Sequence, residues 1–317
     1  MTRCRTATAF APASIGNVAV GFDMLGLAVA GVGDRVTARR SDEPGIRLDE
    51  VRDPDGRPHA SLAARAEENT ATVAARAFWE THGDGGGVTL CVHKGIPLAS
   101  GMGSSAASAV AGAVAVNALL DVPLAFESLL PYALAGEELA SGAVHADNVA
   151  PSLIGGLVLC PPVLLPRVLR LDVPDDLCSV LLHPELEIST AESRKSLAAT
   201  YTLGQWLQQQ GYLAAFIAAL CKGDRDLLRA SLRDVVIEPQ RKAAVPCFDA
   251  VQSAALDAGA FGSSLSGSGP SLFAICAQDD GEAVRAAMQA ACRSAGIACD
   301  AWISPLSAAG ARVEERK

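Results

Sequence analysis

Apolar and polar side chains follow one another along this chain in two periods, one typical of strands and one typical of helices. Residues 88–92 alternate between apolar and polar side chains, which predicts a half-buried strand. Residues 104–120 are small and apolar on every side, which predicts a buried helix. Residues 68–87 predict a helix that Asn69 or Thr70 can cap and that a run of glycines ends.

The N-terminal part of the chain has weaker periodicity. Val18, Val20 and Phe22 alternate with other residues and favour a strand, although the nearby glycines mark turns or bulges. Residues 41–59 are polar and rich in proline and aspartate, so we expect a surface loop or hairpin there.

The second half of the chain repeats the mixture of helices and strands. Residues 190–202 predict a helix with Thr190 as its cap. Residues 261–276 predict two paired strands around a serine–glycine turn, and residues 298–306 the last strand. Because helices and strands do not alternate strictly, the pattern favours an α+β fold over a doubly wound sheet.

Length and composition predict how the chain divides into domains and which residue types form its core. A chain of 317 residues is long for one compact core, so we expect two domains, residues 1–165 and 166–317. Half of the residues are hydrophobic but only 4% are aromatic, so the core consists mainly of Ala, Val and Leu.

Charge and cysteine content narrow the classes of partner. A net charge of -9 argues against nucleic acid and anionic membranes as partners, so a phosphate ligand needs local positive potential. The nine cysteines contain no CxxC spacing, which favours reduced core residues in a cytoplasmic protein. The start of the chain has no signal-peptide pattern, and the most apolar stretch, residues 106–116, is too short to span a membrane.

The segment ASGMGSSAAS, residues 99–108, is the strongest candidate for a binding loop. Gly101, Gly103 and Ala106 satisfy the dinucleotide pattern G-x-G-x-x-A, but Pro97 separates them from the preceding strand. A Walker A loop needs a lysine that is absent here. A glycine–serine loop at a helix N-terminus can bind phosphate, and a plain capped helix is equally compatible with this segment alone.

Three motifs together resemble the GHMP kinases. IPLASGMGSSAASAVAG is similar to the phosphate-binding motif P-x-x-x-G-L-G-S-S-A-A of that family, with Met102 in place of leucine. APASIGNVAVGFDMLGLAV and GSSLSGSGPSLFAIC resemble the first and third motifs of the family. The resemblance covers nearly the whole chain. It implies a two-domain GHMP kinase fold with a mixed N-terminal nucleotide-binding domain and a ferredoxin-like C-terminal domain.

Further segments resemble the homoserine-phosphorylating branch of the family. These segments are SGAVHADNVAPSLIGG, STAESRKSL, IEPQRKAAVPCF and AAGARV. The resemblance implies a cytoplasmic, homodimeric enzyme of threonine biosynthesis that phosphorylates the side-chain hydroxyl of L-homoserine with ATP and Mg²⁺. A GHMP kinase for another small alcohol and a non-catalytic nucleotide-binding protein are the alternatives.

The resemblance also implies which residues bind ATP and the metal ion. Ser105 and Glu137 match the family's magnesium ligands, although Glu137 alone reads as a solvated helix residue. Ser263, Ser266, Gly267 and Gly269 belong to the third motif, which completes the phosphate shell from the other domain. The nucleotide is expected to contact Asn69, Pro97, Ser100, Gly101, Met102, Gly103, Ser104, Ser105, Ser266 and Gly267.

Homoserine is a zwitterion and needs groups of both charges. Asn17 and Asp23 match family residues near its amino end, and Arg194 and Arg241 match the pair that clamps its carboxylate. His145 and Thr190 complete the expected substrate site, although His145 alone reads as a structural histidine. Members of the family usually have Leu-Pro after the helix that carries Arg194, and this chain lacks that proline.

The catalytic residues are less evident. Asn148 stands where mevalonate-type relatives have an aspartate, and the adjacent Asp147 is expected to face structural partners. Lys94 precedes the phosphate loop, where it can reach a phosphate or simply end a strand at the surface. The resemblance therefore implies transfer that depends on positioning and magnesium more than on a strong base.

Overall fold

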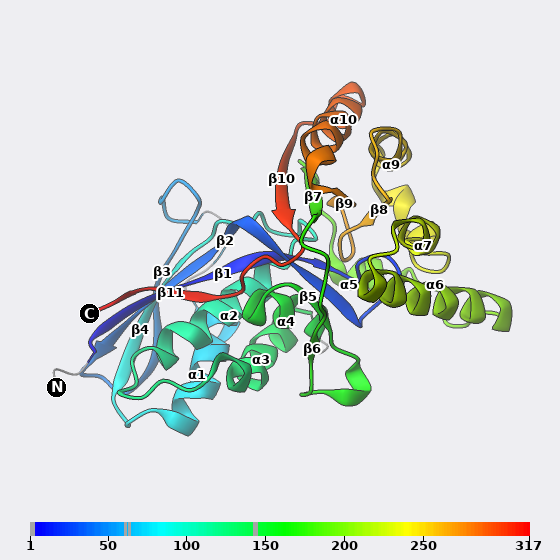
Figure 1. Cartoon of the computed structure of the whole chain (residues 1–317). Helices are drawn as coiled ribbons and strands as arrows, with labels where there is room; N and C mark the ends of the chain where they lie inside the picture. Colours follow the sequence, from blue (N-terminus) through cyan, green and yellow to red (C-terminus); the bar gives the residue numbers. More distant parts are fainter. Residues whose placement is uncertain (1–3, 60–61, 63–64, 142–144) are drawn as a thin grey trace.

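The computed structural model describes residues 4–59, 62, 65–141 and 145–317. Two sheets, each with its own helices, organise this part of the chain (Figure 1).

The first sheet has seven strands and comes mainly from the first half of the chain. Its main path runs β11-β1-β2-β4-β3, and β5 pairs with β2 and with β6. The pair β3–β4 is parallel and the other pairs are antiparallel. Its strands are β1 (Thr6–Gly16), β2 (Leu25–Ser41), β3 (Gly45–Arg52), β4 (Gly87–His93), β5 (Leu157–Leu159), β6 (Leu169–Arg170) and β11 (Arg312–Arg316).

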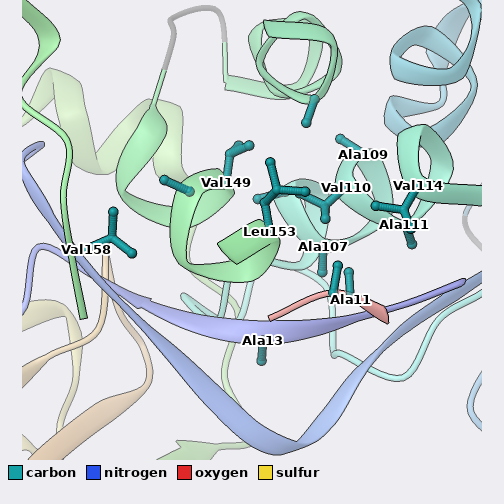
Figure 2. Close-up of a cluster of buried hydrophobic side chains, with 14 of the residues drawn as sticks. Ala11, Ala13, Ala107, Ala109, Val110, Ala111, Val114, Val149, Leu153 and Val158 are labelled. Carbon is teal, nitrogen blue, oxygen red and sulfur yellow. The ribbon is translucent and has the colours of Figure 1, made fainter. Parts of the chain in front are cut away.

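Four helices cover one face of this sheet (Figure 1). They are α1 (Thr70–His82), α2 (Ser104–Asn117), α3 (Leu130–Ser141) and α4 (Ala146–Ile154). In α2 every residue except Ser105 is buried, as the all-apolar pattern predicts. Figure 2 shows Ala107 and Ala111 of this helix facing Ala11 of β1, so small side chains let helix and strand approach closely.

The second sheet has four antiparallel strands in the order β10-β7-β9-β8. These strands are β7 (Leu177–Pro184), β8 (Gly262–Leu265), β9 (Leu272–Ala277) and β10 (Cys299–Pro305). In chain order this is the 4-1-3-2 arrangement of the ferredoxin-like fold, so the predicted C-terminal architecture and the α+β class are confirmed.

Helices connect the strands of the second sheet. Between β7 and β8 lie α5 (Thr190–Lys195), α6 (Leu203–Lys222), α7 (Arg225–Ser231), α8 (Glu238–Arg241) and α9 (Phe248–Asp257), and α10 (Gly281–Ser294) links β9 to β10. Short 3-10 turns occur at Ala66–Glu68, Phe126–Leu129, Pro162–Leu164, Lys242–Ala244 and Gln278–Asp280.

Two local predictions are wrong, and a third is wrong only in part. The polar stretch 41–59 is not a plain surface loop, because it contains β3, which pairs with a parallel partner strand, but the antiparallel bridge between Arg52 and Pro58 fits the hairpin alternative. The alternation of Val18, Val20 and Phe22 is not a strand, since residues 17–24 form turns. The strand at 299–305 is followed by another, β11, which pairs with β1.

The cap of α5 is also different from the prediction. The side chain of Ser189, rather than that of Thr190, accepts a hydrogen bond from the Glu192 amide at 3.3 Å. The Thr190 hydroxyl instead lies 3.3 Å from that of Ser268.

The division at residues 165 and 166 stays a proposal. Strands β6 and β11 follow that boundary in the chain, yet both belong to the first sheet. The end of the chain therefore returns to the N-terminal part of the structure (Figure 1).

Candidate active site

A cavity of about 290 Å³ is lined by residues of both sheets' domains. Most of the residues expected to bind ligands border it. They are Asn17, Asp23, Asn69, Lys94, Ser100, Gly101, Gly103, Ser104, Ser105, Glu137, His145, Asn148, Thr190, Arg194, Arg241 and Gly267.

Three of the expected nucleotide residues do not border the cavity. Met102 is completely buried in the core, and its carbonyl accepts a hydrogen bond from the Ser14 amide at 3.0 Å. The Ser266 hydroxyl donates to the Gly101 carbonyl at 2.6 Å, so it holds the loop from behind. Pro97 likewise lies outside the lining. These residues shape the loop instead of facing the cavity.

The loop before α2 has the geometry of a phosphate cradle. Gly101 and Gly103 have φ angles of +74° and +68°, which other residues adopt only under strain. A Cβ at Gly101 would lie 2.6 Å from the carbonyl oxygens of Ser266 and Gly269. No side chain of the described residues caps α2, so the amides of its first turn remain available at the cavity wall.

Lys94 is buried beneath this loop. Its ammonium group donates to the completely buried Asp34 carboxylate, to the Ser104 carbonyl at 2.9 Å and to the Ser108 hydroxyl at 2.7 Å. Asp34 also accepts from the amides of Gly95 and Ile96. Since all three ammonium protons have protein acceptors, the surface position considered for Lys94 is wrong. The cluster fastens the start of α2 to the strands behind it.

Ser105 and Glu137 both line the cavity and contact each other. Burial raises the pKa of the Glu137 carboxyl to about 7, although a hydrogen bond with Ser105 acts in the opposite direction. A nearby cation would stabilise the charged form of such a buried carboxylate. The described residues contain no cluster of three or more His, Cys, Asp or Glu side chains that could hold a metal ion.

Charged side chains of both signs gather at the other end of the cavity. Arg194 Nη2 donates to both Asp23 oxygens, at 2.6 and 2.8 Å, and His145 Nδ1 lies 3.6 Å from Asp23 Oδ1. Burial acts to raise the pKa of Asp23, but the hydrogen bonds of His145 and Arg194 hold it below its ordinary value. The bond to Asp23 raises the pKa of His145 in turn.

Several donors at this end have no partner among the described residues. They are Nε of Arg194, Nε of Arg241 and Nε2 of His145, all of them buried. Arg241 uses only Nη1, which donates to the Gly267 carbonyl at 3.2 Å. Unpaired buried donors are rare in folded proteins, so their convergence on one cavity indicates an anionic ligand group.

Asn148 and Asp147 form the floor between the two ends. The Asn148 carbonyl accepts from the Ser14 hydroxyl at 3.0 Å, and its amide nitrogen lies 3.4 Å from Asp147. Asp147 borders the cavity and also accepts from the Asn17 amide at 3.1 Å. Burial raises the pKa of Asp147 above its ordinary value. Asp147 therefore has the structural partner expected of it, and it also borders the cavity.

Sequence reasoning missed several lining residues. Ser108 had a usable signal, because it is a hydroxyl one turn after Ser104 in an otherwise apolar helix. Phe22 had a weak one, as a rare aromatic residue inside a motif. Leu98, Ala99 and Ser268 lie inside the quoted motifs and Thr70 was considered only as a helix cap, whereas no pattern singled out Leu62 and Glu68.

Comparisons with known proteins show the family of this chain. Residues 69–156 match the GHMP kinases N terminal domain and residues 216–294 match the GHMP kinases C terminal family. The homoserine kinase of Xanthomonas campestris pv. campestris (strain B100) is 44% identical over 98% of this chain and 94% of its own. That of Xylella fastidiosa (strain M12) is 45% identical over 97% of this chain and 94% of its own.

A solved structure is similar over the same length. The crystal structure of homoserine kinase from Cytophaga hutchinsonii ATCC 33406 has a TM-score of 0.92 and 40% identity, and 97% of each chain is covered.

The fold and the two domain matches define a kinase of the GHMP class, with the two-domain architecture of that class. At more than 40% identity over almost the whole length, the chain belongs to the homoserine kinase family. The resemblance that the motifs indicate is thus confirmed. None of the described helices is long and apolar enough to cross a membrane.

Proposed function

We propose that this enzyme transfers the γ-phosphoryl group of ATP to the side-chain hydroxyl of L-homoserine and so makes O-phospho-L-homoserine for threonine biosynthesis. One observation carries the proposal: a single cavity holds an uncapped helix N-terminus at one end and charged groups of both signs at the other. The names of the 44–45% identical relatives support the same substrate.

We assign the triphosphate to the glycine–serine loop. The glycines would allow the backbone to approach phosphate oxygens, and the first amides of α2 would donate to them. Asn69 caps α1 through its side-chain oxygen, which accepts from the amides of Ala71 and Thr72 at 3.1 and 3.3 Å. Its position at the cavity wall supports the expected place of the nucleotide base beside α1.

We assign Mg²⁺ to Ser105 and Glu137. Mg²⁺ is commonly bound through one or two carboxylates together with substrate phosphates, which fits a site with one buried carboxylate and one hydroxyl. Bound there, the ion would neutralise charge that develops on the phosphates. Lys94 then acts as a positioning residue for the loop, because its protons already have acceptors.

We assign the amino-acid end of homoserine to the charged cluster. Asp23 would bind the ammonium group, with Asn17 beside it, because the Asn17 side chain accepts from the Asp23 amide at 3.0 Å. The unpaired nitrogens of Arg194, Arg241 and His145 would bind the carboxylate. Thr190 faces the same space from α5.

In the transfer step, the homoserine oxygen forms a bond to the γ-phosphorus while the bond to the leaving ADP oxygen breaks. Asn148 would orient the hydroxyl, because Ser14 fixes its side chain. Asp147 would take the proton, because it borders the cavity beside Asn148 and burial makes its carboxylate more basic than that of an ordinary aspartate. Most of the acceleration would still come from positioning and charge stabilisation.

We also propose a cytoplasmic location and a homodimer. All nine cysteines are free, which suits a reducing compartment. Leu203, Trp206 and Leu207 at the start of α6 are exposed apolar side chains, which suits contact with a second copy. Sedimentation at micromolar concentration should give twice the chain mass, and a monomer would remove the dimer from the proposal.

Substrate analogues test the charged cluster directly. With ATP and Mg²⁺, 4-hydroxybutyrate lacks the ammonium group and 3-amino-1-propanol lacks the carboxylate. We expect each to lose at least about a hundredfold in kcat/KM, because each lacks one of the two charged groups that the cluster would bind. Equal turnover of all three alcohols would show that the cluster does not read the zwitterion and would favour a kinase for another small alcohol.

A further inference from the structure

Phe22 is an aromatic side chain at the cavity wall to which the proposed function gives no role. Its ring centroid lies 5.2 Å from Cζ of Arg194 and 5.3 Å from Cζ of Arg241. The two arginines come from α5 and α8, so three separate parts of the chain meet at this ring. We propose that Phe22 is a positioning residue that holds both guanidinium groups in the geometry that binds the substrate carboxylate.

The positive charges of Arg194 and Arg241 lie together in a poorly hydrated space. A group that attracts both of them therefore stabilises the arrangement. Burial, and after it the charge of Arg194, lowers the pKa of Arg241. Asp23 neutralises Arg194, whereas in the part of the chain that the structure describes Arg241 has only the Gly267 carbonyl as a hydrogen-bond partner. The negative face of an aromatic ring attracts a guanidinium group without occupying its N–H donors. Phe22 therefore stabilises both arginines and leaves their donors available for a carboxylate.

The backbone around Phe22 is fixed to the same place. Asn17 and Asp23 both have φ angles in the left-handed region, +67° and +57°, so the turn between them is strained. Asn17 Nδ2 donates at 2.9 Å to the Gly267 carbonyl, which is also the acceptor of Arg241. The turn that carries the ring is thus tied to the group that holds one of the arginines.

This inference rests on the proposed function, and kinetics with both substrates test it. Phe22→Leu should raise the KM for L-homoserine about tenfold and change kcat and the KM for ATP by less than about twofold, because only the cation–π contacts are lost. Phe22→Tyr keeps the ring face and should stay within about twofold of the unchanged enzyme. Thermal melting of each variant checks that it is folded.

Phe10 provides a matched control. Its ring lies 4.9 Å from Arg35 Cζ and 4.1 Å from Arg312 Cζ, so it has the same two-arginine arrangement outside the cavity. Phe10→Leu should therefore leave both KM values within about twofold of the unchanged enzyme, even if it lowers the melting temperature.

A double variant separates positioning from direct contact with the substrate. In an Arg241→Met background, Phe22→Leu should add less than about threefold to the KM for homoserine, because one of the held groups is already absent. A full tenfold further rise would overturn the positioning role, as would an unchanged KM in Phe22→Leu alone or an equal rise for ATP. Failure of the unchanged enzyme to phosphorylate homoserine would instead overturn the proposed function, and this role with it.

Discussion

At the scale of single residues, burial decides what Glu137 can do. Its side chain is 6% exposed, and its pKa of about 7 lies well above the ordinary value of 4.5. A raised carboxyl pKa contributes stability below pH 4.5 that is lost as the pH rises through 7. The free protein therefore carries an unfavourable charge at neutral pH, which a bound cation would compensate.

Replacing Glu137 by glutamine removes that charge. In urea unfolding of the ligand-free protein, Glu137→Gln should be more stable than the unchanged chain by about 3 kcal/mol at pH 8 and by less than about 1 kcal/mol at pH 5. Glu138→Gln changes an exposed neighbour on the same helix and should alter stability by less than about 0.5 kcal/mol. A destabilised Glu137→Gln at pH 8 would contradict the assigned environment.

The role of Arg241 in binding the substrate carboxylate can be measured directly by substitution. Arg241→Met should raise the KM for homoserine on the order of tenfold to a hundredfold, because a charged hydrogen bond to the carboxylate is lost. The KM for ATP should stay nearly constant. Arg229→Met offers a matched change at an exposed arginine that lies over Phe261, and it should leave both KM values unaltered. An effect of Arg241→Met on ATP alone would place this residue at the nucleotide.

Sequence reasoning reached most of the site residues through motifs, because a motif specifies residue types at positions fixed by the fold. It could not predict which partners a single side chain has in the folded protein. Lys94 looked like a surface or phosphate-facing cation, and only the distant Asp34 shows that its charge is already paired. The ring of Phe22 likewise gains its meaning from arginines about 170 and 220 positions further along the chain.

At the scale of elements, the loop before α2 depends on glycine for space as well as for conformation. Gly101 and Gly85 both have positive φ angles, +74° and +81°. A Cβ at Gly101 would meet two carbonyl oxygens at 2.6 Å, whereas one at Gly85 would meet nothing within 4 Å. The two positions therefore separate the cost of the backbone conformation from the cost of the close approach.

Alanine at each position measures that difference. Gly85→Ala should cost about 1 kcal/mol of unfolding free energy, and Gly101→Ala about 3 kcal/mol, because only the second displaces the third-motif loop. Gly101→Ala should also raise the KM for ATP several-fold. Equal stabilities of the two variants in urea, with equal KM values, would mean that the loop tolerates a side chain there.

Element prediction succeeded where periodicity was strong and local. The helix at 70–82 and the buried helix at 104–117 follow from such patterns. It failed for β3, whose polar sequence becomes a strand only because β4 pairs with it, and for residues 17–24, where contacts with the second domain hold strained turns. Partners far along the chain decide both cases.

At the scale of the whole molecule, the last strand returns to the first sheet. Strand β11 pairs with β1, and Arg316 donates to the carbonyl oxygens of Ala118 and Leu120 behind α2. Along the chain, the second domain therefore lies between two strands, β1 and β11, that pair with each other in the first sheet. Sequence analysis placed the last strand too early because the exposed stretch 312–316 has no apolar periodicity.

Removing residues 312–317 tests the importance of this return. The truncation leaves β1 as an unprotected edge, so the melting temperature should fall by at least about 5 °C and aggregation should increase. Glu314→Gln keeps β11 in place and weakens only its surface ion pairs with Arg35 and Arg312, so it should shift the melting temperature by less than about 2 °C. An unchanged melting temperature of the truncated chain would show that β11 adds no stability.

The central claim is that one cavity joins ATP and L-homoserine for phosphoryl transfer. Phosphorus NMR of the enzyme with ATP, Mg²⁺ and one alcohol at a time measures this directly, because the product resonances identify the phosphorylated hydroxyl. We expect O-phospho-L-homoserine and ADP in equal amounts with L-homoserine, and no phosphorylated product with galactose or mevalonate. Phosphorylation of galactose or mevalonate with none of homoserine would contradict the account.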